Sequence, residues 1–202
     1  MLLSSIWSLS LCLFSAAGAL AAKNDQVHHP TVYLIRHGEK PADPGNHELT
    51  LEGLKRAQCL RQVFGAKSEY NIGYIMAPKM KSSNGGHGRA FKTVQPLAAD
   101  LGLDVDMHCG RKNTDCVADA IRSYDGAGDI LVSWRHTNMG QIQAALGSDE
   151  PVEYPDDRGI NESCRYDLVW TIPYPYHRIT VTQSEKCPGL DARDHPDLVV
   201  QY

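Results

Sequence analysis

Apolar runs with the length of buried strands recur along the chain. The predicted strands of this kind are Val32–Ile35, Ile72–Met76, Leu103–Met107 and Asp129–Trp134. The first is aliphatic and does not alternate with polar residues, as is typical of a strand covered on both faces, and the last is the clearest of the four. Leu168–Ile172 and Arg178–Thr182 alternate instead and predict an antiparallel pair or edge strands.

Helical patterns fill the intervals between these strands. The predicted helices begin near Thr50, at Arg89, at Val117 and at Met139, and end at Gly65, Leu101, Tyr124 and Leu146. Thr50 is suited to cap the first helix, and Pro96 is expected to kink or break the second. Strands that alternate with helices predict an α/β fold, a three-layer α/β/α sandwich with a mostly parallel sheet. We find no domain boundary and expect residues 23–202 to form a single domain.

The first 22 residues differ from the rest because they contain no charged side chain. Their apolar stretch, Ile6–Phe14, is shorter than the roughly 20 residues of a membrane span, and Ala19-Leu20-Ala21 fits a cleavage site after a signal peptide. Residues 1–22 are therefore predicted to be a secretory signal peptide, with a signal anchor as the alternative. The mature protein is expected to be secreted and to have no stable membrane insertion.

An oxidising compartment changes how the cysteines are interpreted. After loss of Cys12 with the signal peptide, five cysteines remain, and an odd number leaves at least one thiol outside an intramolecular pair. Cys59 lies within a helical pattern and is predicted to be a small buried apolar residue. The simplest pairs are Cys109–Cys116 and Cys164–Cys187; a metal site is disfavoured because the usual close ligand spacings are missing. Asn161-Glu162-Ser163 is the single glycosylation triplet, with Asn161 as the acceptor.

Two of the predicted strands end in the same pair of residues. Arg36-His37 follows the first strand and Arg135-His136 follows the fourth. Ligands of open α/β sheets bind at the carboxyl ends of the strands, so we expect both imidazoles at one rim of the sheet. The net charge of the 202-residue chain is −4, which gives no basic footprint for nucleic acid.

Four motifs in order resemble the histidine phosphatase superfamily, which includes phosphoglycerate mutases and many acid phosphatases. They are Ile35-Arg36-His37-Gly38-Glu39, the helix start Leu49-Thr50-Leu51-Glu52-Gly53-Leu54-Lys55-Arg56-Ala57, Arg89-Ala90-Phe91-Lys92-Thr93 and Trp134-Arg135-His136. The resemblance extends from Val32 to about Gly147. Arg56 departs from the glutamine that the family's motif has at this point.

The resemblance implies hydrolysis of phosphate esters through a phosphohistidine on His37. Arg36 and Arg89 would bind the phosphate, because a guanidinium matches its geometry and keeps its charge. His136 would bind and stabilise the transferring group. This positive charge removes the need for a metal, and no cofactor is implied. We expect the partner to be a phosphorylated small molecule; the sequence does not predict an oligomeric state.

The general acid that protonates the leaving group is harder to place. Thr137 follows His136, so no acid stands there. Asp106, at a predicted strand end on the same rim, is the favoured candidate, followed by Asp115 and Glu39. Two other functions stay open: a mutase, disfavoured by export, and a catalytically silent secreted protein that binds a phosphorylated ligand.

Overall fold

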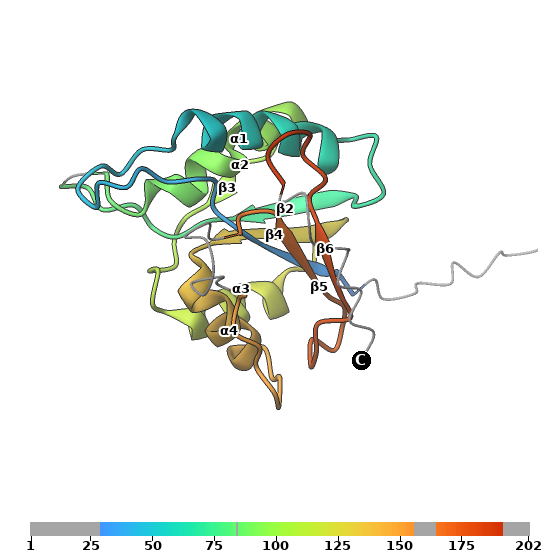
Figure 1. The fold of residues 1–202 in the computed structure, drawn as a ribbon. Coiled ribbons are helices and arrows are strands. Elements are labelled where there is room, and N and C mark those ends of the chain that lie inside the picture. Colours follow the sequence, from blue (N-terminus) through green and yellow to red (C-terminus); the bar gives the residue numbers. More distant parts are fainter. Residues whose placement is uncertain (1–28, 84, 156–164, 192–202) are drawn as a thin grey trace, which may run out of the picture.

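The computed structural model describes residues 29–83, 85–155 and 165–191, and these form a six-stranded sheet between two pairs of helices (Figure 1). The strands are β1 Val32–Arg36, β2 Ile72–Met76, β3 Val105–Asp106, β4 Asp129–Trp134, β5 Leu168–Ile172 and β6 Val181–Ser184. The helices are α1 Leu51–Val63, α2 Gly88–Leu101, α3 Thr114–Ser123 and α4 His136–Ala145. The elements follow the order predicted from the sequence, and α2 continues through Pro96 as one helix.

The sheet has the order β3-β2-β4-β1-β5-β6. The strands β1 to β4 run parallel, whereas β5 is antiparallel to both of its neighbours. The predicted antiparallel pair is therefore confirmed, and so is the mostly parallel α/β sandwich. No helix among the described residues is long and apolar enough to cross a bilayer.

Both faces of the sheet are buried, which explains the unalternating apolar strands. Leu34 of β1 packs in a cluster with α3 and α4, while the adjacent Ile35 packs on the opposite face with Leu60 of α1 and Leu97 of α2. Figure 1 shows the same division, with α1 and α2 above the sheet and α3 and α4 below it. This arrangement leaves the ends of the strands as the place where polar side chains gather.

Two disulfides connect described residues, and one of them corrects the sequence prediction. Cys109 bonds Cys116, as predicted. Cys187 bonds Cys59, 128 residues away, and not Cys164. Cys59 is thus a bridging residue and not a free apolar one, because the segment after β6 lies against α1. Residues 1–22, Asn161 and Cys164 lie outside the described residues.

Candidate active site

The carboxyl ends of β1 and β4 bring the two predicted histidines together. These strands are neighbours in the sheet, with Arg36 opposite Trp134. The backbone N–H of His37 donates to the Trp134 carbonyl, with nitrogen and oxygen 2.9 Å apart, and this bond holds the ends of β1 and β4 together. His136 is the first residue of α4. Both imidazoles line one pocket of about 360 Å³.

His37 is held as a neutral imidazole with one ring nitrogen committed. Its Nδ1 lies 2.7 Å from the Gly38 carbonyl oxygen, and because a carbonyl only accepts, Nδ1 carries the proton. Burial lowers the pKa of His37 to about 3; the bond to Gly38 opposes this shift, and the charges of Arg36 and Arg89 add to it. The Nε2 lone pair is therefore available at neutral pH.

The loop after β1 is fixed by the first turns of α1 and α2. The Gly38 N–H donates to the Thr93 hydroxyl over 2.8 Å, and that hydroxyl donates to the Arg89 carbonyl. A Cβ at Gly38 would lie 3.0 Å from the Gly53 carbonyl oxygen, and a Cβ at Gly53 would lie 2.6 Å from the Glu39 carbonyl oxygen. A Cβ thus has no room at Gly53, and at Gly38 it would be tighter than an ordinary contact. Thr50 caps α1 through its side chain, as predicted.

Arg36 is a fully buried cation with part of its hydrogen-bonding capacity unused. Its Nη1 donates to the Arg165 carbonyl over 2.7 Å, and its guanidinium carbon lies 3.9 Å from the centre of the Tyr166 ring. Its Nε and Nη2 have no hydrogen-bond partner among the described residues. No carboxylate of the described chain pairs with it. A buried guanidinium in this state indicates a site for an anion.

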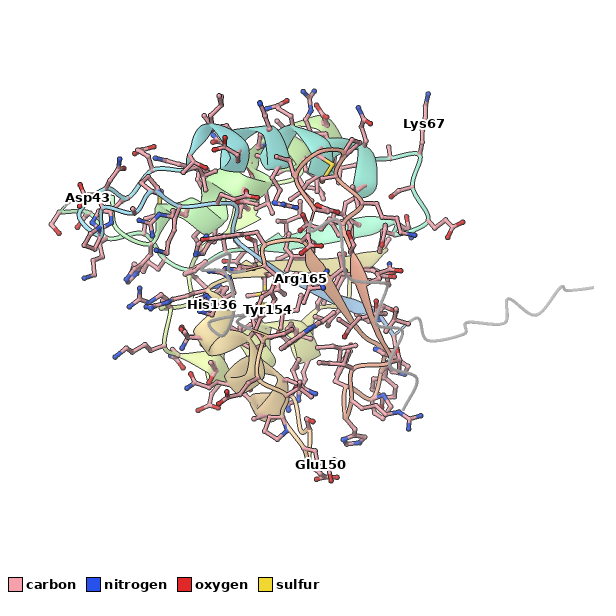
Figure 2. All side chains as sticks on the ribbon, viewed as in Figure 1. Asp43, Lys67, His136, Glu150, Tyr154 and Arg165 are labelled. Atoms are coloured by element: carbon pink, nitrogen blue, oxygen red, sulfur yellow. A yellow bond between two sulfur atoms is a disulfide. The ribbon has the colours of Figure 1, made fainter. Side chains whose placement is uncertain are left out.

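Arg89 and His136 complete the group around His37. The Arg89 Nε donates to the Glu48 carbonyl over 3.1 Å and its Nη2 donates to the Asn46 carbonyl, so its head is held by backbone and not by a carboxylate. Arg89 and His136 both line the pocket, and the charges of both act on His37. Figure 2 shows His136 close to Tyr154, whose ring centre lies 6.1 Å from that of the imidazole.

The comparisons with known proteins agree with this geometry at the level of fold. No family model and no curated protein matches the sequence. Among solved structures, one described as the phosphohistidine phosphatase SixA from Agrobacterium tumefaciens matches with a TM-score of 0.53 and 16% identity, over 78% of this chain and 99% of that one. A structure of the protein histidine phosphatase SixA complexed with tungstate matches with 0.50 and 17%, over 77% and 97%. The chain has the SixA fold.

Within this SixA fold, Asp106 does not reach the pocket. Its carboxylate accepts from the Tyr74 hydroxyl and, over 2.9 Å, from the His108 N–H, and it lies 2.7 Å from His108 Nδ1. Tyr74 packs with the cluster on the α3 and α4 face of the sheet. Burial alone raises the pKa of Asp106, but the bonds from Tyr74 and His108 outweigh it and hold the pKa below its ordinary value. The Asp106 carboxylate is thus ionised and lies on the α3 and α4 face of the sheet, so it is poorly placed to donate a proton to a leaving group in the pocket.

The other two candidate acids are also directed elsewhere. Glu39 is bound by Arg56, with Oε1 2.8 Å from Nη2, and Asp115 is exposed in the first turn of α3. Neither lines the pocket. The only set of potential metal ligands found among the described residues is His108, Cys109 and Cys116. Its two cysteines are joined in a disulfide and offer no thiolate.

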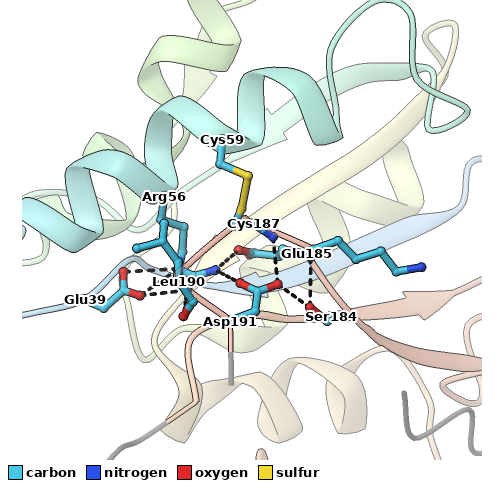
Figure 3. Close-up of a disulfide and its surroundings, with 9 residues drawn as sticks. Glu39, Arg56, Cys59, Ser184, Glu185, Cys187, Leu190 and Asp191 are labelled. Carbon is cyan, nitrogen blue, oxygen red and sulfur yellow. Dashed lines mark hydrogen bonds and ion pairs between the residues drawn. A yellow bond between two sulfur atoms is a disulfide. The ribbon is translucent and has the colours of Figure 1, made fainter. Parts of the chain in front are cut away.

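A buried ion cluster behind the site was not predicted from the sequence. Arg56, which replaces the glutamine of the resembling motif, is fully buried and binds three carboxylates (Figure 3). Its Nη1 lies 2.6 Å from Glu185 and 3.1 Å from Asp191, while Nε and Nη2 bind Glu39. The cluster joins the loop of His37 to the segment after β6, beside the Cys59–Cys187 disulfide. The only sequence signal was the unexpected arginine itself.

Proposed function

We propose that this protein is a histidine phosphatase that hydrolyses phosphate esters of small molecules through a phosphohistidine on His37. The observation that carries the proposal is the state of His37, which is neutral, buried, fixed through Nδ1 and surrounded by Arg36, Arg89 and His136. The likeness to SixA supports it, since one of those structures holds tungstate, a tetrahedral oxyanion of the same shape as phosphate.

The first step forms a bond from His37 Nε2 to phosphorus and breaks the bond from phosphorus to the ester oxygen. The electron pair leaves with that oxygen. Arg36 and Arg89 oppose the charge that spreads over the three equatorial oxygens, and His136 donates to the same group. Water then attacks the phosphohistidine, which releases inorganic phosphate and restores the imidazole, whose Nδ1–H still donates to the Gly38 carbonyl.

The proposal includes independence from metal ions. The two guanidinium groups and the imidazole of His136 supply the positive charge that a metal would bring to the transition state. We expect phosphatase activity to survive dialysis against EDTA. Loss of activity on chelation, restored by one divalent ion, would instead indicate metal-assisted hydrolysis.

The decisive experiment replaces His37 and follows hydrolysis of p-nitrophenyl phosphate, whose phenolate leaves without help from an acid. We expect His37→Ala to abolish turnover and to keep the fold, and rapid quench of the wild type to trap an acid-labile, base-stable adduct. His177→Ala is the matched control, because His177 also bonds a backbone carbonyl but is exposed and lines a different pocket. Full activity in His37→Ala would contradict the proposal. Binding of phosphate by a wild type without turnover would favour the silent binding protein.

Secretion is also part of the proposal. It is supported by the uncharged segment 1–22 and by two disulfides among the described residues. Expression in a eukaryotic host should give protein in the medium with an N-terminus near residue 23. A shift in mass on enzymatic deglycosylation, lost in Asn161→Gln, would establish Asn161 as the acceptor. Retention of residues 1–22 in a membrane fraction would favour the signal anchor.

A further inference from the structure

The walls of the pocket carry far more positive charge than one phosphate requires. Among the described residues, five cationic side chains and four imidazoles line it, and no carboxylate does. The cationic residues are Lys40, Lys81, Arg89, Arg111 and Arg135, and the histidines are His37, His47, His87 and His136. The whole chain has a net charge of −4, so this concentration is local and opposite in sign to the protein. Such a field selects a multiply charged anion.

A charge balance shows how many cations remain. One phosphate dianion is matched by the guanidinium groups of Arg36 and Arg89. Four further cations then face the pocket, and none of them forms an ion pair with a described residue; they are Lys40, Lys81, Arg111 and Arg135. Three arginines elsewhere in the described chain, Arg56, Arg61 and Arg165, are each paired with carboxylates.

Arg111 is held in place and is not a mobile surface cation. The Cys109–Cys116 disulfide closes its loop, and the Trp134 indole N–H donates to its carbonyl over 2.9 Å. Its Nε is buried and has no hydrogen-bond partner among the described residues. Arg111 and Arg135 line the same pocket, and burial, and after it the charge of Arg135, lowers the pKa of Arg111. Two guanidinium groups on one pocket suit a second anion.

Within residues 29–83, 85–155 and 165–191, no carboxylate lines the pocket, and this restricts which leaving groups these residues can release. An alkoxide needs a proton as it departs, and Asp106, Asp115 and Glu39 do not line the pocket. A leaving phosphate needs none, because its charge is stable in water and is neutralised by guanidinium groups. A leaving group that is itself a phosphate explains both the surplus of cations and the lack of an acid among the described lining residues.

Resting on the proposed function, we propose that this pocket prefers phosphoanhydrides to simple phosphate esters and removes their terminal phosphoryl group, with Arg111 and Arg135 binding the phosphate that leaves. The His37 Nε2 lone pair forms the bond to the terminal phosphorus, and the bond from that phosphorus to the bridging oxygen breaks. The electron pair stays on the bridging oxygen, which departs as the new end of the shortened chain. Water then hydrolyses the phosphohistidine. The substrate is either a free oligophosphate or the phosphate end of a nucleotide.

Hydrolysis of four substrates tests this proposal on the full mature protein. They are tripolyphosphate, a nucleoside triphosphate, glycerol phosphate and p-nitrophenyl phosphate. We expect kcat/KM for at least one anhydride to exceed that for glycerol phosphate by about tenfold or more, and the better anhydride identifies the source. Arg111→Gln and Arg135→Gln should each lower the ratio of anhydride to aryl ester kcat/KM by about 10- to 100-fold, as expected for a lost charge-assisted hydrogen bond. Arg178→Gln, on the turn between β5 and β6 at the opposite end of the sheet, should leave this ratio unchanged.

Calorimetry separates binding from chemistry. In His37→Ala, tripolyphosphate should bind at least tenfold more tightly than inorganic phosphate, and Arg111→Gln should remove this difference. Hydrolysis of p-nitrophenyl phosphate without hydrolysis or preferential binding of either anhydride would overturn this inference and leave the proposed function standing. No hydrolysis of any substrate would overturn both. Preference for glycerol phosphate, or for an acidic phosphopeptide added as a further substrate, would also overturn it.

Discussion

Arg36 and Arg56 are both completely buried, yet they have opposite surroundings. Arg56 binds Glu39, Glu185 and Asp191, and each of its nitrogens has a partner. Arg36 donates through Nη1 to a backbone carbonyl, and its other two nitrogens have no partner among the described residues. The first arginine therefore joins segments of the protein, while the second holds unused donors beside His37.

The difference shows how to separate a structural ion from a functional one. Burying a charge is costly, and the protein recovers this cost at Arg56 with three carboxylates. At Arg36 the cost is tolerated without a counter-ion among the described residues, which is expected where a ligand supplies the anion. The exposed fraction does not distinguish the two arginines, because both are completely buried. Their hydrogen-bond and ion-pair partners do distinguish them.

The largest expected effect comes from replacing Arg36. Arg36→Gln should lower kcat for p-nitrophenyl phosphate by about 10³-fold or more, because a guanidinium that opposes transition-state charge is lost. The free energy of unfolding should stay the same or rise, since a buried cation without a counter-ion is removed. Steady-state kinetics and urea unfolding measure the two. A strongly destabilised variant with normal kcat would make Arg36 a structural residue like Arg56.

Breaking the Cys59–Cys187 disulfide should have the next largest effect. This bond closes a loop of 128 residues, against 7 for Cys109–Cys116. Chain entropy predicts a loss of about 5 kcal/mol for the long loop and about 2.5 kcal/mol for the short one. Unfolding of the Cys59→Ala/Cys187→Ala and Cys109→Ala/Cys116→Ala double variants compares them directly. Equal losses would show that the ion cluster, and not the disulfide, fixes the segment after β6.

Replacing Arg56 should have the opposite effect to replacing Arg36, with a large loss of stability and little loss of activity. Arg56→Gln leaves Glu185 and its neighbours without their cation and should cost about 3–5 kcal/mol of unfolding free energy. The folded variant should keep kcat within a few-fold of the wild type. Arg61→Gln is the control, because Arg61 pairs with Asp100 at the surface and should cost less than about 1 kcal/mol. A loss of activity without loss of stability would place Arg56 in the catalytic machinery.

The effect that is smallest for each step of the measurement is a pH dependence of stability that belongs to His37. Its pKa is about 3 in the folded protein, below the ordinary value of 6.5. Between these values the unfolded chain binds a proton that the folded chain does not. The free energy of unfolding should therefore fall by up to about 1.4 kcal/mol per unit as the pH is lowered from 6.5 towards 3, with no contribution above 6.5. His37→Gln should flatten this slope, whereas His177→Gln should not.

Much of the candidate site could be predicted because it depends on short stretches of sequence. His37 and His136 each follow a buried strand directly, and a parallel sheet brings such ends to one rim. Thr93 and Gly53 lie in motifs that the sequence analysis quoted, and the structure gives each a physical role. The Thr93 hydroxyl accepts from the Gly38 N–H, and Gly53 lies so close to the backbone of Glu39 that a Cβ has no room there. The carboxylate of Asp106 does not line the pocket, because the direction of a strand side chain reverses with each residue and a position at the strand end did not fix the face on which it lies.

The sequence by itself determined the α/β order of elements, the rim with its two histidines and the Cys109–Cys116 pair, because each depends on local periodicity or on residues only a few positions apart. The tertiary structure alone decided the Cys59–Cys187 bond, the carboxylates around Arg56 and the ring of cations around the pocket. These features join segments up to about 130 residues apart, as Arg56 and Glu185 are. A local sequence pattern does not predict which distant segments pack together, because that depends on the burial of both faces of the sheet. The packing decides which charged residues pair with each other, and so which are structural and which are free to bind a ligand.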